Sequence, residues 1–151
     1  MKSDEVNEMT SKIIGCAMKV HREMGFGFLE SVYENALLHE LRKSGFEVQK
    51  QMPIKVYYDG IVVGDFIADI VVNGAVILEL KAVQSVNVIH EVQLVNYLQA
   101  TGMDDGLLFN FGAKSLEFKR KHHLPKENTS KGLSGVTGLV AIFCGKLMGH
   151  F

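Results

Sequence analysis

The chain contains little cysteine, with only Cys16 and Cys144 among its 151 residues. They lie far apart and form no CxxC or Cys/His spacing, so the sequence indicates neither a disulfide framework nor a zinc site. The first eight residues are acidic and polar, and no secretory signal is visible. The longest uninterrupted apolar run near the C-terminus is too short to cross a bilayer. We therefore expect one cytoplasmic domain without a membrane anchor, since 151 residues suit a single core.

Charge is divided unevenly along the chain. Residues 1–113 carry nine Lys/Arg against fifteen Asp/Glu, a balance of −6, whereas residues 114–151 carry seven against two, a balance of +5. A basic stretch between Lys114 and Lys126 could meet phosphate groups, but a charge run is more often a solvated surface. Charge alone therefore does not decide the partner.

The pattern of apolar residues changes from helical to β-type spacing after Gly45, and it later returns to helical spacing. Asp-Gly and Asn-Gly pairs between the β-type runs are hairpin signals, which predict three antiparallel strands. The expected helices cover residues 5–24, 30–43 and 90–100, and the expected strands cover 46–58, 61–72, 75–80, 106–111 and 115–118. The order ααβββαβ(β) predicts an α/β (α+β) fold, with a mixed central β-sheet flanked by helices.

Ionisable residues interrupt two of these apolar strands. Asp69 lies near the end of the second strand, where a carboxylate is costly unless it is paired or metal-bound. In the third strand, Glu79 and Lys81 lie on one face while Leu80 points to the other. The alternative interpretation is an ordinary surface pair on an exposed strand, because short Glu-x-Lys matches are common.

The length of the turn at Asn73-Gly74 decides whether the two carboxylates meet. A two-residue turn would place Asp69 and Glu79 on opposite faces of the sheet. A three-residue loop that includes Ala75 would bring them side by side, and we predict this second register. Two facing carboxylates suit a hard divalent cation such as Mg²⁺ or Mn²⁺. Lys81 could then orient the attacking water or stabilise charge on a phosphodiester.

Two further groups of polar residues accompany these strands. His90, Gln93, Asn96 and Tyr97 recur at helical spacing, so this face could position a water or bind a DNA backbone. The alternative is the polar outer face of an amphipathic helix. Glu30 lies at the beginning of the second helix, where simple interaction with the helix dipole is an equally plain explanation.

Several ordered motifs together resemble the GxxExxY proteins, a family placed within the PD-(D/E)XK nuclease superfamily. The resemblance covers about residues 10–121. Its motifs are Gly27-x-x-Glu30-x-x-Tyr33, Val63-Gly64-Asp65-Phe66-Ile67-Ala68-Asp69, Glu79-Leu80-Lys81-Ala82-Val83, Gln93-Leu94-Val95-Asn96-Tyr97-Leu98 and Gly106-Leu107-Leu108-Phe109-Asn110-Phe111-Gly112.

The resemblance implies a restriction-endonuclease-like core over residues 5–121, followed by a C-terminal extension of uncertain structure over residues 122–151. It implies an acidic metal site and a Gln-x-x-x-Tyr element. The expected catalytic residues are Glu30, Asp69, Glu79, Lys81 and Gln93, the expected metal ligands are Asp69, Glu79 and Glu30, and the expected substrate contacts are Tyr97 and Tyr33. His21 stands where some members of the superfamily carry a helix histidine, but its spacing is not diagnostic, and a helix-surface histidine is expected.

The favoured function is a Mg²⁺- or Mn²⁺-dependent nuclease, endonuclease or exonuclease, that cleaves DNA by metal-activated water. The alternative from another class is a non-catalytic nucleic-acid-binding or protein-interaction module that retains the fold. A small-molecule enzyme would need a closed pocket, for which the sequence gives no sign. No helix-turn-helix or zinc finger is recognisable, so we expect a protein partner to supply any targeting.

Overall fold

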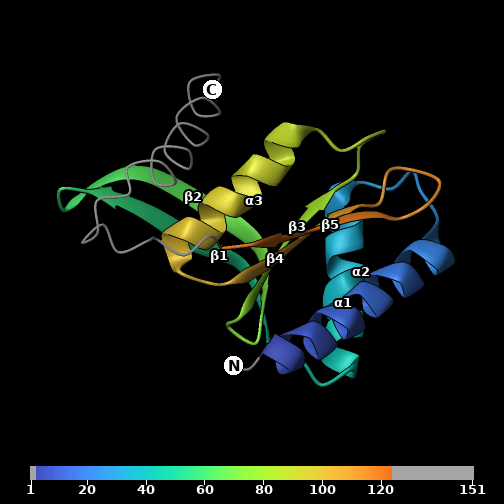
Figure 1. Cartoon of the computed structure of the whole chain (residues 1–151). Helices are drawn as coiled ribbons and strands as arrows, with labels where there is room; N and C mark the ends of the chain where they lie inside the picture. Colours follow the sequence, from blue (N-terminus) through green and yellow to red (C-terminus); the bar gives the residue numbers. More distant parts are fainter. Residues whose placement is uncertain (1–2, 124–151) are drawn as a thin grey trace.

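The computed structural model describes residues 3–123 as three helices and a five-stranded sheet (Figure 1). The elements in chain order are α1 (Ser3–Met24), α2 (Glu30–Lys43), β1 (Val48–Tyr58), β2 (Ile61–Val72), β3 (Val76–Lys81), α3 (Val88–Thr101), β4 (Asp105–Asn110) and β5 (Glu117–His122). This arrangement confirms the expected α/β class, the order of elements and the mixed central sheet. None of the helices in the described part is long and apolar enough to cross a membrane.

The strands are arranged in the sheet in the order in which they occur in the chain, β1-β2-β3-β4-β5. Three of the four neighbouring pairs are antiparallel, and β3 and β4 are parallel. The parallel pair requires a crossover connection, and α3 provides it. The end of β3 therefore leads directly into the helix that covers this part of the sheet.

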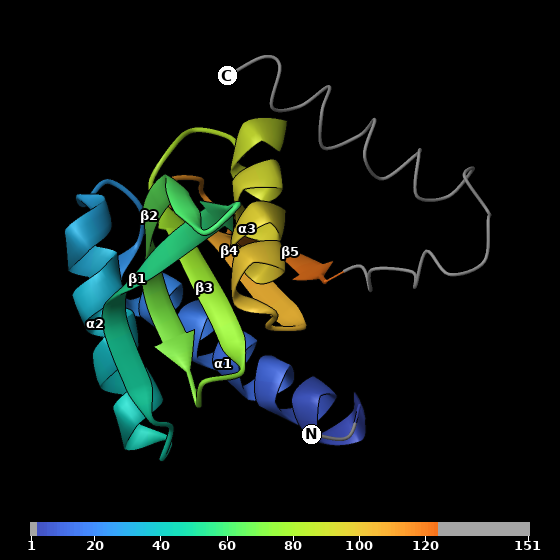
Figure 2. The same cartoon turned by 90° about the vertical axis from the view of Figure 1, so that its left-hand side faces the viewer.

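Helices cover both faces of the sheet (Figures 1 and 2). One apolar core forms between the sheet and α1 and α2, and it contains Leu78 and Leu80 of β3. A second, smaller core forms beneath α3 and contains Ile77 and Tyr97. Because alternate residues of a strand point to opposite faces, Glu79 and Lys81 lie on the α3 side of β3.

Local sequence explains where α3 begins and ends. The Asn87 side chain accepts a hydrogen bond from the Ile89 N–H at 3.1 Å, so it caps the helix two residues earlier than the apolar pattern indicated. The helix ends at Gly102, which has a φ of 73°. Such a left-handed conformation favours glycine at a helix C-terminus.

The last described strand is the element whose predicted bounds were furthest from the structure. A strand was expected over 115–118, but β5 runs from Glu117 to His122. The charged residues of β5 lower its β-propensity, so the sequence pattern did not indicate a strand over these residues. Charged residues nevertheless suit a strand at the edge of a sheet. The predicted domain boundary at residue 121 falls within β5. The rest of the expected C-terminal extension, including Cys144, lies outside the described residues, as does Lys126 at the end of the basic stretch.

Helix α1 contains a buried free cysteine, Cys16. The surface position expected for His21 is wrong, because this side chain is only 8% exposed. Its Nε2 atom lies 2.9 Å from the carbonyl oxygen of Ala113, and its ring packs against Phe111. His21 therefore holds α1 against the loop after β4, an interaction over ninety-two residues that local spacing could not indicate.

Candidate active site

The turn between β2 and β3 has the three-residue length that brings the two carboxylates together. Val72 pairs with Val76, and the Ala75 N–H donates to the Val72 carbonyl oxygen at 3.0 Å. Asn73 takes a φ of 52°, a left-handed conformation that asparagine tolerates better than most residues. The same register pairs Ile70 with Leu78, so the next position along places Asp69 beside Glu79. This confirms the predicted register.

Beyond Ile70 and Leu78 the backbone pairing of β2 with β3 ends, and the two carboxylates take its place. The Leu80 N–H donates to Asp69 Oδ2 at 2.9 Å. The Asp69 N–H donates to Glu79 Oε1 at 3.1 Å. Each acidic side chain is thus held by the backbone of the opposite strand, which fixes both carboxylates at the point where the strands diverge.

This position makes the Glu79 charge costly. Glu79 is only 4% exposed, and burial, followed by the charge of Asp69, raises the pKa of its carboxyl to about 8. The nearby Lys81 ammonium acts in the opposite direction but does not offset the burial. Two adjacent carboxylates in a poorly solvated position therefore hold a proton, or they require another positive charge.

Glu30 lies close to the same group, at the first position of α2. Burial raises the pKa of its carboxyl, the Lys81 charge lowers it, and the charges of Asp69 and Glu34 raise it. The structure therefore brings residues from α2, β2 and β3 to one place. Glu34, one helical turn after Glu30, was not singled out in the sequence; it is 6% exposed, and its Oε1 accepts a hydrogen bond from Gln51 Nε2 at 2.7 Å.

The loop that precedes Glu30 is held by Tyr33. Its hydroxyl donates to the Gly25 carbonyl oxygen at 2.6 Å and accepts from the Phe28 N–H at 3.2 Å. Gly27 within this loop has a φ of 114°, a conformation that favours glycine. Tyr33 is fully buried, so the structure places it beneath the loop and not where a substrate would touch it. Its position suits it to orient Glu30.

On the opposite side of the site, α3 presents Gln93 and Tyr97. The Gln93 Nε2 donates to the Tyr97 hydroxyl at 2.8 Å, which confirms that the two side chains share a face. Tyr97 is 4% exposed, so this is not simply the outer face of an amphipathic helix. Burial and the charges of Glu79 and Asp69 raise the pKa of Tyr97 to about 12. Its hydroxyl therefore keeps its proton and lies near the carboxylates.

The donor set is suitable for a divalent cation, although the residues do not form a complete metal site. Asp69 and Glu79 supply hard oxygen donors, and their mutual repulsion is what a cation would relieve. Among residues 3–123, however, no three His, Cys, Asp or Glu side chains are gathered closely enough to hold a metal ion. Asp69 and Glu79, two of the three expected metal ligands, are thus adjacent. The third expected ligand, Glu30, lies near them but not close enough to complete a three-ligand metal site.

The segment that follows Lys81 is held by Asn110, a residue whose importance the sequence did not indicate. Its Oδ1 accepts from the Val83 N–H and the Gly112 N–H, both at 3.0 Å. Its Nδ2 donates to the Val83 carbonyl oxygen and to Glu117 Oε2, both at 2.9 Å. The available signal was one amide residue directly after an apolar run in β4, and the structure shows that this side chain is fully buried.

Part of the basic stretch is already neutralised within the protein. Arg120 Nη2 lies 3.1 Å from Asp105 Oδ1, and Lys121 Nζ lies 2.7 Å from Glu91 Oε1. These pairs favour the solvated-surface interpretation for this part of the stretch. They leave fewer free cations for phosphate groups than the sequence suggested.

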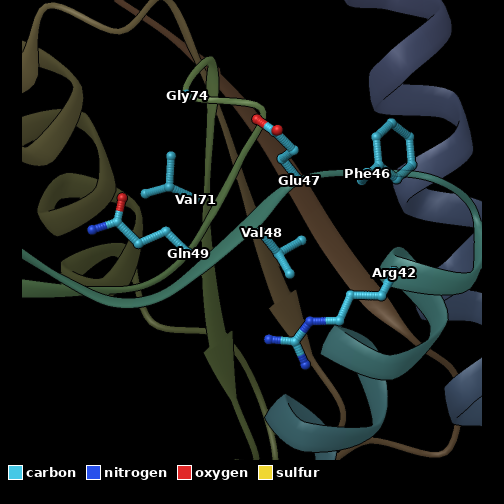
Figure 3. Close-up of a pocket in the computed structure, with 7 residues that line it drawn as sticks. All are labelled: Arg42, Phe46, Glu47, Val48, Gln49, Val71 and Gly74. Atoms are coloured by element: carbon cyan, nitrogen blue, oxygen red, sulfur yellow. The ribbon is translucent and has the colours of Figure 1, made fainter.

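A pocket elsewhere on the molecule does not include the carboxylates. It lies near the turn between β2 and β3 and is lined by Arg42, Phe46, Glu47, Val48, Gln49, Val71 and Gly74 (Figure 3). None of the expected site residues lines it. The pocket therefore gives no support to a small-molecule enzyme built on Asp69, Glu79 and Lys81.

The fold and the site together define an α/β domain with acidic residues where two neighbouring strands of a mixed sheet diverge. The chain belongs to the PD-(D/E)XK nuclease superfamily, whose family model matches residues 7–121. A solved structure described as "Crystal structure of SSO0001" matches with a TM-score of 0.51 and 17% identity, over 75% of this chain and 56% of that one. That likeness shows the fold alone, and this chain spans little more than half of that protein. No curated protein matches the chain.

Proposed function

We propose that this protein is a metal-dependent nuclease that cleaves DNA phosphodiester bonds. The single observation that carries the proposal is the pairing of Asp69 with Glu79 across diverging strands, with Lys81 on the same face. Membership of a nuclease superfamily supports the same conclusion. The finer assignment to the GxxExxY proteins remains part of this proposal, supported by the placement of Gly27, Glu30 and Tyr33 around one loop.

Each residue of the site has a proposed role. Asp69 and Glu79 hold Mg²⁺ or Mn²⁺, and Glu30 supplies a further acidic ligand. When bound, the cation supplies Lewis acidity that activates a water and offsets negative charge on the phosphate. Lys81 orients the attacking water and stabilises charge that develops on the phosphodiester. These roles require no movement of β2 relative to β3, because the two carboxylates are already adjacent.

The α3 residues complete the proposed site. Gln93 supports the water or the phosphate through its amide, and its Nε2 donates to the Tyr97 hydroxyl at 2.8 Å, so the two act as a unit. Tyr97 contacts the substrate through that hydroxyl, which keeps its proton. A protein partner that directs the nuclease to its target, and a cytoplasmic location, remain predictions from the sequence.

A non-catalytic binding module is the second candidate, and one observation favours it. The described residues contain no complete three-ligand metal site, which a non-catalytic module would not need. A module of this kind would keep the fold and bind nucleic acid or protein without cleaving it. Metal-dependent cleavage separates the two candidates.

The experiment measures cleavage of linear, nicked and single-stranded DNA by purified protein with Mg²⁺ or Mn²⁺. Glu79→Gln and Lys81→Ala are compared with Asp65→Asn and Lys55→Ala, which change exposed residues of β2 and β1. We expect cleavage to be lost in the first two variants and kept in the two controls. Equal activity in all five proteins would assign the cleavage to a contaminant, and no activity in any would favour the binding module.

A further inference from the structure

His90 lies in the first turn of α3, and one of its ring nitrogens makes a hydrogen bond with the backbone at the start of the helix. The Asn87 N–H points at its Nδ1 atom, with a distance of 3.3 Å between the nitrogens. A backbone N–H can only donate, so Nδ1 must be the acceptor. The ring is therefore neutral, and its single proton is on Nε2. This leaves Nε2–H as a hydrogen-bond donor that α3 itself does not use.

The surroundings of His90 place it on the Lys81 side of the candidate site. It is one turn before Gln93 on the same helix, and the pair formed by Gln93 and Tyr97 faces the carboxylates. Burial and the positive charge of Lys81 both lower the pKa of His90. The ring thus remains neutral beside Lys81, because a second positive charge there would be repelled.

The start of α3 is also open to an approaching molecule. Val88 is 56% exposed and Ile89 is 45% exposed, and His90 itself is only partly buried. An anionic group that reaches Lys81 from this side would meet the beginning of the helix. The partial positive charge at a helix N-terminus is favourable for such a group, but it gives no position for an individual oxygen atom.

We propose that His90 is a substrate-binding residue that donates its Nε2–H to a non-bridging oxygen of the phosphate undergoing cleavage. This inference rests on the proposed function and adds a residue to it. Lys81 supplies the positive charge at this part of the site, and neutral His90 supplies a directed hydrogen bond to the phosphate. A hydrogen bond to a charged partner contributes about 1.5–3 kcal/mol, which corresponds to roughly a 10- to 100-fold change in binding or rate.

The simpler alternative is that His90 only caps the helix. The hydrogen bond from Asn87 N–H to His90 Nδ1 completes a reciprocal capping box, in which glutamate or glutamine is the more usual partner. The two nitrogen atoms of the ring therefore have separable roles. Nδ1 accepts the hydrogen bond that caps the helix, and Nε2–H donates to the substrate.

Two substitutions test the donor at Nε2. In His90→Asn, the amide oxygen takes the place of Nδ1 and can still accept from the Asn87 N–H, but the donor at Nε2 is lost. In His90→Gln, the longer side chain keeps an N–H donor, and glutamine is a usual capping-box residue at this position. His90→Asn therefore removes the donor, and His90→Gln is the matched control that retains both a cap and a donor.

The measurements are melting temperature, kcat and KM for DNA cleavage with Mg²⁺, and DNA binding by fluorescence anisotropy with Ca²⁺. For His90→Asn we expect an unchanged melting temperature and a cleavage efficiency reduced roughly 10- to 100-fold, with weaker binding. For His90→Gln we expect an unchanged melting temperature and a cleavage efficiency within a few-fold of the unaltered protein.

The opposite pattern would overturn the inference. If His90→Asn cleaves and binds DNA as well as His90→Gln and the unaltered protein do, His90 is a helix cap only. If the unaltered protein cleaves no DNA, the proposed function fails and this inference fails with it. Normal cleavage by the unaltered protein and by His90→Asn would overturn the inference while leaving the proposed function intact.

Discussion

Glu79 accepts a hydrogen bond from the backbone N–H of Asp69, and Asp69 accepts one from the backbone next to Glu79, at Leu80. The two acidic side chains therefore replace the strand pairing that stops one position earlier. This arrangement fixes both carboxyl groups close together in a poorly solvated position. The charge of this preformed site therefore depends on protons and cations.

The first prediction concerns how stability changes with pH. The pKa of Glu79 is about 8 in the folded protein, well above its ordinary value of 4.5, so the folded state binds more protons than the unfolded state between these values. The stabilisation due to protonated Glu79 is fully present below about pH 4.5 and is lost as pH rises through 8. In metal-free buffer, the free energy of unfolding should therefore fall across this range because of this group.

Glu79→Gln tests that prediction, because glutamine is neutral at every pH. The variant should gain roughly 1–3 kcal/mol relative to the unaltered protein between about pH 5 and pH 9, as urea denaturation with EDTA would show. Asp65→Asn, which changes an exposed residue of the same strand as Asp69, should follow the unaltered protein. Parallel stability curves for Glu79→Gln and the unaltered protein would show that Glu79 ionises normally.

The second prediction concerns metal binding without reference to cleavage. If Asp69 and Glu79 hold a divalent cation, Mg²⁺ or Mn²⁺ should raise the melting temperature, because a ligand of the folded state stabilises it by mass action. The effect should be larger at about pH 8.5 than at about pH 6, since the proton on Glu79 competes with the cation.

Asp69→Asn should abolish most of that metal-dependent shift. Thermal denaturation with and without metal, supported by titration calorimetry with Mn²⁺, measures it directly. Glu8→Gln is a suitable control, because Glu8 is exposed on α1 and pairs with Lys12 on the same helix. An equal metal-induced shift in the unaltered protein and Asp69→Asn would place the cation elsewhere.

Hairpin chemistry and apolar periodicity were sufficient to predict most of the fold. Asp59-Gly60 and Asn73-Gly74 marked both turns, and the alternation of apolar residues identified the strands between them. The turn at Asn73-Gly74 allowed two registers, and one residue of register decides which face a side chain occupies. The three-residue loop was predicted because it lets Asp69 and Glu79 meet, and the structure has that register.

Residues whose roles depend on distant contacts could not be found in this way. Asn110 holds the segment after Lys81 across twenty-seven residues of sequence, and His21 reaches Ala113 across ninety-two. Tyr33 was expected to touch substrate, but the structure places it under the loop before Glu30. In each case the sequence shows the residue type, while the partner is determined by packing between elements.

The third prediction concerns Tyr33 as a residue that positions Glu30. Tyr33→Phe removes the hydroxyl that donates to the Gly25 carbonyl oxygen and accepts from the Phe28 N–H, while it keeps the ring stacked on Phe111. We expect a loss of about 1–2 kcal/mol in the free energy of unfolding. Cleavage should be reduced through kcat more than through KM, because Glu30 would be less well placed.

The matched control is Tyr58→Phe, because Tyr58 is 73% exposed on β1. It should change neither the stability nor the activity. A normal kcat together with a raised KM in Tyr33→Phe would return Tyr33 to the role of a substrate contact, against its buried position.

The fourth prediction concerns Gly112, which follows β4 and approaches the chain just after Lys81. A Cβ atom at Gly112 would collide with the backbone of Val83 and Ala82, which cannot move aside as a flexible side chain could. Gly112→Ala should therefore destabilise the protein by roughly 2 kcal/mol or more, because the added methyl group would overpack this position against the backbone. It should also disturb the hydrogen bonds between Asn110 and Val83 that hold the end of β3.

Gly15→Ala provides the matched control. Gly15 is exposed in the middle of α1, and a Cβ atom there would meet nothing within 4 Å. Alanine is the better helix former by about 1 kcal/mol, so this variant should be slightly more stable than the unaltered protein. Thermal and urea denaturation of the two variants should thus give changes of opposite sign. If Gly112→Ala proved as stable as Gly15→Ala, the close backbone approach behind Lys81 would be wrong, and the position of Lys81 in the site would need to be reconsidered.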